Sequence, residues 1–330
     1  MKKTVLKFSA AILAIAFNVS SLTAQIDIGE ILKAGIDDAE KLGYAYLEPF
    51  GKMMGSSLNG GWYQSAKPHK TLGFNITLAA SATLSPVDAR TFDVTKLGLE
   101  SITLKDPNDN MASTIAGNLE SDPTMQILQS SGQTVEFDLP QGANIFIMPV
   151  PFLQVGLGLP FSTEVSARFL PAFNLGKFGR LNMWGIGVKN QFKDFIPGLK
   201  EVPIDLSILL GYTQLKYDYD IDANAGQNLF LDASGFTGRL LVGKSIPFLS
   251  VYAGLGFSKS NTDMGLKGDY KIGVGSEEVS QTDPLNLSFP HDTFSANIGA
   301  RLRLGVFSLH ADYTLGKYSV FAGGIGVSFR

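Results

Sequence analysis

Three polar side chains with the identities of a hydrolytic triad occur close together near the end of the chain. Ser308, His310 and Asp312 alternate with apolar residues, which predicts that they share one face of a β-strand. Residues two apart on a strand are about 7 Å from each other, whereas a triad needs hydrogen-bond contact between the base and both partners. The spacing favours a polar strand face, so no catalytic residue and no enzymatic activity are predicted.

Carboxylates suggest calcium at two places. The three aspartates within 218–222 follow a predicted strand, and a solvated loop explains them better than a site with oxygen ligands for Ca²⁺. The segment Asp106–Asn110 begins like a calcium-binding loop. Met111 stands where that loop requires glycine, and Gly117 stands where it requires glutamate. We therefore predict no metal site and no cofactor.

Strands that alternate between apolar and polar residues are expected to position these groups. Segments of about 10–11 residues joined by short turns match tilted strands that cross a bilayer. Such strands are predicted near residues 72–83, 145–159, 161–172, 181–190, 203–218, 229–243, 248–259, 294–304, 306–315 and 318–329.

The predicted fold class is all-β, a transmembrane antiparallel β-barrel of 10–14 strands, with twelve as the best estimate. Twelve includes residues 92–104 and 135–139, which would form either wall strands or a hairpin within a long loop. The long polar segments 84–143, 219–228 and 260–293 are expected outside the cell, and the short turns and both chain ends in the periplasm. A water-soluble sandwich is the alternative, but it needs neither so many long strands nor an export signal.

An export signal is indicated at the N-terminus. Residues 1–24 contain three lysines, an apolar core over 10–17 and a cleavage site before Gln25. The chain has 330 residues, no cysteine and only 17% charged residues. Without the three signal lysines it carries 24 basic and 30 acidic residues, a net charge of −6, which argues against a nucleic-acid partner.

The predicted domains are a signal peptide (1–24), an N-terminal helical segment (25–70) and the barrel (71–330). Apolar residues recur at helical spacing over 27–57, and Gly43 and Pro49 suggest two short helices there. Residues 55–70 are expected to form an irregular connector. The helical segment would either decorate the barrel in the periplasm or fold into the lumen as a plug. We favour the plug because the segment directly precedes the first strand.

Charged residues on the polar faces are expected to point into the lumen, because charges at membrane depth are tolerated only where they face protein or water. They would either rigidify the interior through salt bridges or line a constriction, and Arg301 and Arg303 should lie beside 308–312 across a hairpin. His69 and His291 are isolated in the sequence and suggest no site. The candidate lumen-lining residues are Glu164, Arg168, Asp205, Arg239, Arg301, Arg303, His310 and Asp312.

The stretches 163–171, 184–189 and 203–212 resemble an uncharacterised family of outer-membrane barrels from Bacteroidota-type bacteria. The order of signal, helical segment and barrel is similar to the fatty-acid transporter (FadL-type) channels, although no ligand-contacting residue can be matched. Phe329, next to last, resembles the aromatic assembly signal of such barrels.

The resemblance implies a porin-like protein of the Gram-negative cell outer membrane, a passive channel for small hydrophobic molecules gated by its plug. The implied partners are outer-membrane lipid, the barrel-assembly machinery and a hydrophobic small-molecule ligand. The alternative is a structural or surface-binding barrel that acts through its extracellular loops.

Overall fold

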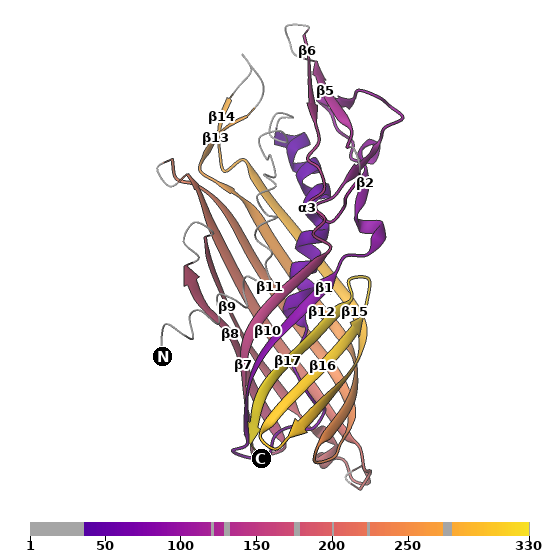
Figure 1. Ribbon diagram of the computed structural model, residues 1–330, viewed down its shortest axis with the longest axis vertical. Coiled ribbons are helices and arrows are strands. Elements are labelled where there is room, and N and C mark those ends of the chain that lie inside the picture. The colour runs from indigo at the N-terminus through magenta and orange to yellow at the C-terminus, as the bar shows by residue number, and fades with distance from the viewer. Residues whose placement is uncertain are drawn as a thin grey trace.

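A computed structural model describes residues 36–119, 122–128, 133–174, 179–199, 201–222, 225–272 and 279–329 (Figure 1). The predicted signal peptide and the first residues of the helical segment, 25–35, lie outside this part. Within the described chain, ten strands pair in the order β1-β17-β16-β15-β12-β11-β10-β9-β8-β7 and close into an antiparallel barrel. The fold class is confirmed, but the best estimate of twelve strands is wrong.

The ten wall strands lie where the alternation predicted them, although several are longer. They are β1 (Phe74–Leu84), β7 (Ile147–Leu159), β8 (Thr163–Asn174), β9 (Arg180–Asn190), β10 (Asp205–Asp222), β11 (Gln227–Ser245), β12 (Leu249–Lys267), β15 (Leu285–Leu304), β16 (Phe307–Leu315) and β17 (Val320–Phe329).

Side-chain burial alternates from one residue to the next along the wall strands. In β16 the outward Phe307 and Leu309 are exposed, and the inward Ser308, His310 and Asp312 are buried. Exposed apolar residues thus cover the outside of the wall in the half nearer the C-terminus. The inward residues there are mostly small or polar, with a few large apolar ones such as Leu209 and Leu241. Within the described residues, no helix is both long and apolar enough to cross a membrane.

The two doubtful segments do not enter the wall, because β1 pairs directly with β7 and closes the barrel without them. They belong to the β1–β7 connection, residues 85–146, which we call the lid. Its strands have only three to five residues and pair among themselves as β2-β4 and β3-β5-β6. The lid elements are η2 (Val87–Ala89), β2 (Thr91–Asp93), η3 (Val94–Lys96), β3 (Ile102–Leu104), β4 (Met111–Ser113), β5 (Thr124–Leu128) and β6 (Thr134–Asp138).

The wall has two heights. Strands β10, β11, β12 and β15 have 18 to 20 residues, whereas the other six have 9 to 13. Half of 260–293, expected as a polar loop, continues the wall through pairs such as Leu266↔Leu285. Beyond it lies the small hairpin β13 (Asp269–Ile272) and β14 (Val279–Thr282).

The apolar and polar faces of β15 exchange sides along the strand. This exchange explains why the sequence predicts a loop for its upper half, residues 285–293. In the lower half Ile298 points outward and is exposed, and Asn297 points inward and is buried. In the upper half the inward residues are apolar, as at Leu287 and Phe289, and the outward Ser288 is exposed. Side-chain direction stays in register while the outer surface changes from apolar to polar.

The long lid and the β13-β14 hairpin lie at the opposite end of the barrel from the short turns near residues 160, 247 and 305, as predicted. The short β16–β17 turn, residues 316–319, lies on the side of the long connections. We call the end with the C-terminus the turn end; it carries residues 160–162, 191–204 with η5 (Phe192–Phe195), 246–248 and 305–306. The opposite end, the loop end, carries the lid and the β13-β14 hairpin (Figure 1).

A single helix, α3 (Ile36–Asn59), lies inside the barrel rather than two short helices. It contacts β11, β12 and β15 on one side and β1 and β7 on another. Pro49 lies within it and removes one backbone hydrogen bond, a cost that the enclosing wall contacts offset. The helix ends at Gly60 and Gly61, where a φ of +70° at Gly61 is easily adopted by glycine. Ile36 lies beside the lid, at the opposite end from that expected for the N-terminal segment.

Candidate functional site

One continuous stretch of chain fills the lumen. We call it the inner segment: helix α3 and the irregular residues 60–70 that follow it. The Trp62 indole lies so close to the wall that a Cβ at Gly187 or Gly211 would come within 2.8 Å or 2.6 Å of its ring. The predicted connector is therefore part of the packed interior. Its buried cluster comprises Trp62, Tyr63, Ala66, Leu209, Leu241 and Tyr252.

Inward polar residues of the wall bind the carbonyl groups of the inner segment. An irregular segment that is buried needs such partners, because its backbone groups have no ladder to satisfy them. The bonds come from β7, β8, β9 and β10: Gln154 to Trp62 at 3.2 Å, Arg168 to Leu58 at 3.2 Å and to Gly60 at 3.1 Å, Lys189 to Ser65 at 3.2 Å, Thr213 to Leu58 at 3.1 Å, and Ser207 to Ala66 at 2.6 Å.

Arg168 anchors the point where the helix ends. Its guanidinium carbon lies 3.5 Å from the ring centroid of Trp62 and 4.3 Å from that of Phe152, so the cation stacks between the inner segment and β7. Arg168 is 1% exposed. One side chain thus combines two carbonyl bonds with two cation–π contacts, and it ties the inner segment to the wall.

Four side chains form a cluster at the turn end, which we call the latch: His69, Glu164, Lys189 and Ser328. His69 Nδ1 lies 2.7 Å from Glu164 Oε2, and His69 Nε2 lies 3.1 Å from Ser328 Oγ. The other oxygen of Glu164 lies 3.2 Å from Lys189 Nζ. The His69 amide also donates to Glu164 at 2.9 Å. The latch joins the inner segment to β8, β9 and β17.

The latch has the nucleophile–base–carboxylate order of a hydrolytic triad. Ser328 is 0% exposed, and the His69 and Lys70 carbonyls press on the wall where a Cβ at Gly158 would come within 2.6 Å and 2.1 Å. A triad also needs space for a reacting carbonyl beside the nucleophile. The latch instead resembles a structural clamp.

The eight predicted lumen residues lie at three levels. Arg168, Arg239 and Asp312 are buried in the middle of the barrel, and Glu164, Asp205 and His310 are buried nearer the turn end. Arg301 and Arg303 are only half-buried; Arg303 donates to the Gly305 carbonyl in the turn. The register places Arg303 opposite Ser308 and Arg301 opposite His310. Arg168 binds the inner segment, and Arg239, Arg301 and Arg303 donate to groups of the wall or its turns.

The lid holds the upper end of the inner segment. The Asp38 carboxylate accepts the backbone N–H groups of Glu100 at 2.9 Å and of Ser101 at 2.7 Å. The Tyr46 hydroxyl donates to the Gln141 carbonyl at 2.9 Å, and the Ile115 amide donates to the Tyr46 carbonyl at 3.0 Å. The inner segment is therefore fixed at the loop end by the lid and at the turn end by the latch.

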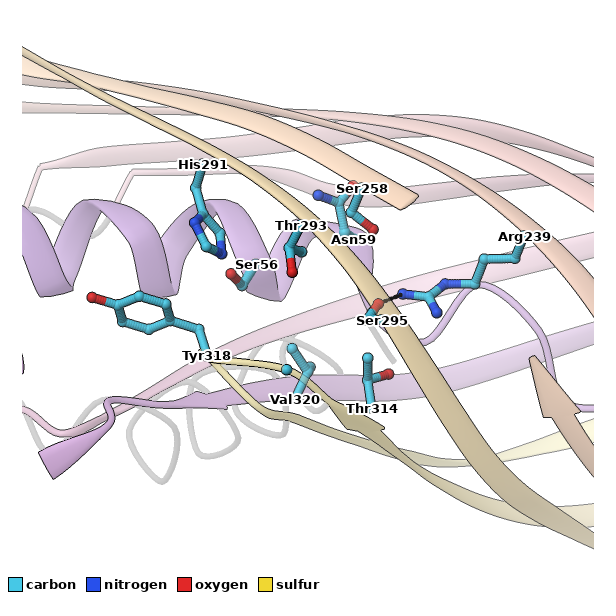
Figure 2. A pocket seen from close by; sticks show the side chains of 12 residues that line it. Ser56, Asn59, Arg239, Ser258, His291, Thr293, Ser295, Thr314, Tyr318 and Val320 are labelled. Atoms are coloured by element: carbon cyan, nitrogen blue, oxygen red, sulfur yellow. Dashed lines mark hydrogen bonds between the residues drawn. The ribbon is translucent and has the colours of Figure 1, made fainter. Parts of the chain in front are cut away.

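A polar cavity of about 20 Å³ lies beside the end of α3 (Figure 2). Arg239 and Ser295 lie on one side of it, and His291 and Tyr318 lie on the other. Its size suits about one water molecule. The lining side chains come from α3, β11, β12, β15, β16 and the chain around β17.

Sequence reasoning missed the contacts between the inner segment and the wall. The prediction that His69 is isolated is wrong, because its carboxylate partner, Glu164, lies 95 residues away in the sequence. Trp62 was assigned to a connector. The only signal available was the glycine at inward positions, such as Gly187 and Gly211, which leaves room for a large side chain from another element.

The sequence matches one family model over residues 1–329, and its description is "Family of unknown function (DUF6588)". A search of curated proteins finds no match.

Several solved structures share the barrel architecture at low identity. Ail, the attachment invasion locus protein of Yersinia pestis, is 8% identical over 78% of this chain and 97% of its own, with a TM-score of 0.27. The translocator domain of the autotransporter NalP from Neisseria meningitidis is 11% identical over 79% and 90%, with a TM-score of 0.29. The Ralstonia pickettii toluene transporter TbuX is 11% identical over 86% and 99%, with a TM-score of 0.22.

Proposed function

Because the chain belongs to DUF6588, a family of unknown function, we propose its function from the geometry: an outer-membrane barrel whose inner segment closes a path for small hydrophobic molecules. The observation that carries the proposal is the inner segment itself. It runs through the lumen from the lid at the loop end to the latch at the turn end, and wall side chains bind it along the way. Passage would require part of this segment to move.

The outer surface supports a membrane location. Every outward residue of β16 is apolar or aromatic and exposed, and all but Ala311 are large. On the neighbouring β15, Ile298 is 65% exposed. An apolar band about 25 Å tall is the mark of an outer-membrane barrel. The polarity inversion within β15 supports an upper edge of such a band between the two halves of this strand.

The side chains in the half of the lumen nearer the loop end support the proposal of a hydrophobic solute. At this level α3 covers Leu285 and Leu287, whose methyl groups lie 3.7 Å and 3.4 Å from the Cβ position of Gly43. Phe289 packs against Gly51 and stacks on Tyr44 with ring centroids 4.9 Å apart. Displacement of the helix would expose an apolar surface there, and the solute would meet the polar middle of the lumen only afterwards.

The test compares an opened and a locked barrel. Deletion of residues 36–66 should raise the permeability of liposomes to toluene and to a small sugar. Ser57 of α3 and Thr83 of β1 lie with their side-chain oxygens 2.7 Å apart, and the chain has no cysteine. The oxidised Ser57→Cys/Thr83→Cys variant should therefore hold the plug closed, and reduction should release it.

Heat-modifiable migration on gels shows whether each variant is folded. A folded deletion variant that is no more permeable than wild type would contradict the proposal. The proposal would also be contradicted if the oxidised Ser57→Cys/Thr83→Cys variant transported solute as fast as its reduced form, under conditions in which the wild-type barrel conducts.

A surface-binding role is the second candidate. The lid favours it, because its buried Val94, Ile102 and Met125 join one hydrophobic core with Leu42 of α3. The lid is thus a structured surface rather than a loose loop. Unchanged permeability on deletion, together with a phenotype confined to lid substitutions, would favour this role.

A further inference from the structure

Large apolar side chains are exposed in or beside every connection that the structure describes at the turn end (Figure 1). They come from the chain just before β1 and from the β7–β8, β9–β10, β11–β12 and β15–β16 connections. Because the wall order distributes these strands around the barrel, the side chains form a ring rather than a patch on one side. We call this ring the collar; it comprises Leu72, Phe161, Phe195, Phe248, Leu304 and Phe307.

Two collar residues hold a backbone conformation that large side chains rarely adopt. Leu72 and Phe161 both have a φ of +62°, in the left-handed region where glycine and asparagine are the usual residues. Leu72 is 70% exposed and Phe161 is 80% exposed, so packing within the chain does not explain why these residues are large and apolar. A residue that is both strained and exposed is expected where its side chain contacts something outside the chain.

The outer face of β15 shows that the collar lies at the edge of the apolar surface. Its outward residues are apolar from Phe294 to Leu304, whereas the next outward residue toward the loop end, Asp292, is charged and exposed. The 10 steps from residue 294 to residue 304 span about 26 Å at a rise of about 3.4 Å and a tilt of about 40°. The apolar band of an outer-membrane barrel is about 25 Å tall, so the band reaches the collar at Leu304.

Cations accompany the collar. Lys67, Lys70 and Lys244 are exposed at the turn end, and Glu201 is the one exposed acidic side chain that the structure describes there. The chain as a whole has 27 basic and 30 acidic residues, so composition does not explain the excess of cations at this end. Lysine beside an apolar surface extends its ammonium group toward water, to the level at which a bilayer presents its headgroups.

We propose that the turn end binds anionic phospholipid, with the collar among the acyl chains and the three lysines beside the headgroup phosphates. Apolar side chains together with lysines on one surface suit an anionic lipid surface. The ring arrangement favours a lipid leaflet, which surrounds the barrel, over a protein partner, which would cover one side of it. The inference rests on the membrane location of the wall and not on a path through the lumen.

The first test measures where the collar lies. Tryptophan replaces Phe161 or Phe248 in the Trp184→Phe barrel, which is reconstituted in phosphatidylcholine vesicles with bromine on the acyl chains near the headgroup, and the Trp62 emission of the parent is subtracted. Both variants should be quenched at least about twofold, because their side chains lie among the acyl chains. The matched control is Leu128→Trp, since Leu128 is 71% exposed in the lid; it should not be quenched.

The second test measures the headgroup. Brominated phosphatidylglycerol should quench Phe161→Trp about twofold more than brominated phosphatidylcholine at the same mole fraction, because the lysines concentrate anionic lipid beside them. The triple variant Lys67→Gln/Lys70→Gln/Lys244→Gln should lose this excess. The matched control is Lys96→Gln/Lys105→Gln/Lys317→Gln, which changes exposed lysines on the side of the loop end and should keep it.

Heat-modifiable migration shows that each barrel is folded. Absence of quenching at both collar positions would overturn the proposal and would make a soluble protein the better occupant of the collar. An excess that survives removal of the three lysines at the turn end, or an excess that the barrel with all its lysines does not show, would overturn the headgroup assignment. Neither test measures transport, so their outcomes are independent of the permeability test above.

Discussion

Removal of the latch carboxylate should loosen the lower end of the inner segment. In Glu164→Gln the side-chain oxygen can still accept a hydrogen bond from the backbone N–H of His69, whose nitrogen lies 2.9 Å from Glu164 Oε2 in the wild-type protein. The amide cannot neutralise Lys189, whose ammonium lies 3.2 Å from Glu164 and whose side chain is 4% exposed. In the described part of the chain, the buried cation then keeps the Ser65 carbonyl, at 3.2 Å, as its hydrogen-bond acceptor.

The expected loss is large. Breaking a buried ion pair by removing one partner costs about 3–5 kcal/mol, because an uncompensated charge remains, whereas replacing both partners costs much less. The double variant Glu164→Gln/Lys189→Met should therefore recover about 1–3 kcal/mol of the loss, a coupling typical of residues in direct contact. The matched control is Glu136→Gln. Glu136 lies 2.6 Å from Lys105, but both side chains are about half exposed, so the change should cost at most about 1 kcal/mol.

The assay is equilibrium unfolding in denaturant, with the barrel in phospholipid bilayers and tryptophan emission as the signal. Trp62 lies in the inner segment and Trp184 lies on the outer wall, so Trp184→Phe isolates the plug. A loss below about 1 kcal/mol for Glu164→Gln would refute the reasoning, as would a double variant whose loss equals the sum of the single ones. Either result would mean that the latch does not hold the inner segment.

Three further predictions concern the fit, the membrane surface and the orientation. Gly211→Ala should lower the free energy of unfolding by about 1–3 kcal/mol, because the added methyl group overpacks against Trp62. The same change should cost less in a Trp62→Ala background. Strictly additive losses in unfolding experiments would contradict the contact. Leu240→Arg, at an outward position that is 58% exposed, should cost about 2–4 kcal/mol in bilayers, whereas arginine at the outward Ser288, above the polarity inversion, should be nearly neutral; equal costs would place the membrane boundary elsewhere. In intact cells, a membrane-impermeant maleimide should label Asp37→Cys at the loop end but not Lys67→Cys at the turn end, and the reverse pattern would show that the barrel is oriented the other way.

Packing also limits what the inward positions tolerate. Ser207 faces the lumen, is 0% exposed and donates to the Ala66 carbonyl. At Gly299 a Cβ would come within 2.6 Å of both Asp312 and the Tyr252 ring. In a water-filled pore, large polar residues at these sites would be harmless. Here a large residue at position 207 would displace the inner segment, and one at position 299 would clash with wall side chains. The polar face of the strands therefore does not indicate a wet lumen.

The sequence by itself determined the features that depend on neighbouring residues. Alternation over strands such as β9 and β16 predicted their position and the direction of each side chain, because the side-chain period of a strand is local. The contrast between short turns and long segments predicted that the lid and the short turns near residues 160, 247 and 305 lie at opposite ends. The prediction of a polar loop failed in the upper half of β15. There the inward face is apolar and the outer face is polar, which is the inverse of a membrane strand.

Only the tertiary structure decided how many strands close the barrel and what fills it. Ten strands suffice because β1 and β7 pair directly, a contact across 62 intervening residues that leaves the short lid strands outside the wall. The partners of the inner segment are equally distant: His69 meets Glu164, and Trp62 meets Arg168, Gly187 and Gly211. Such contacts depend on shape and charge complementarity between segments, which no periodicity within one segment encodes.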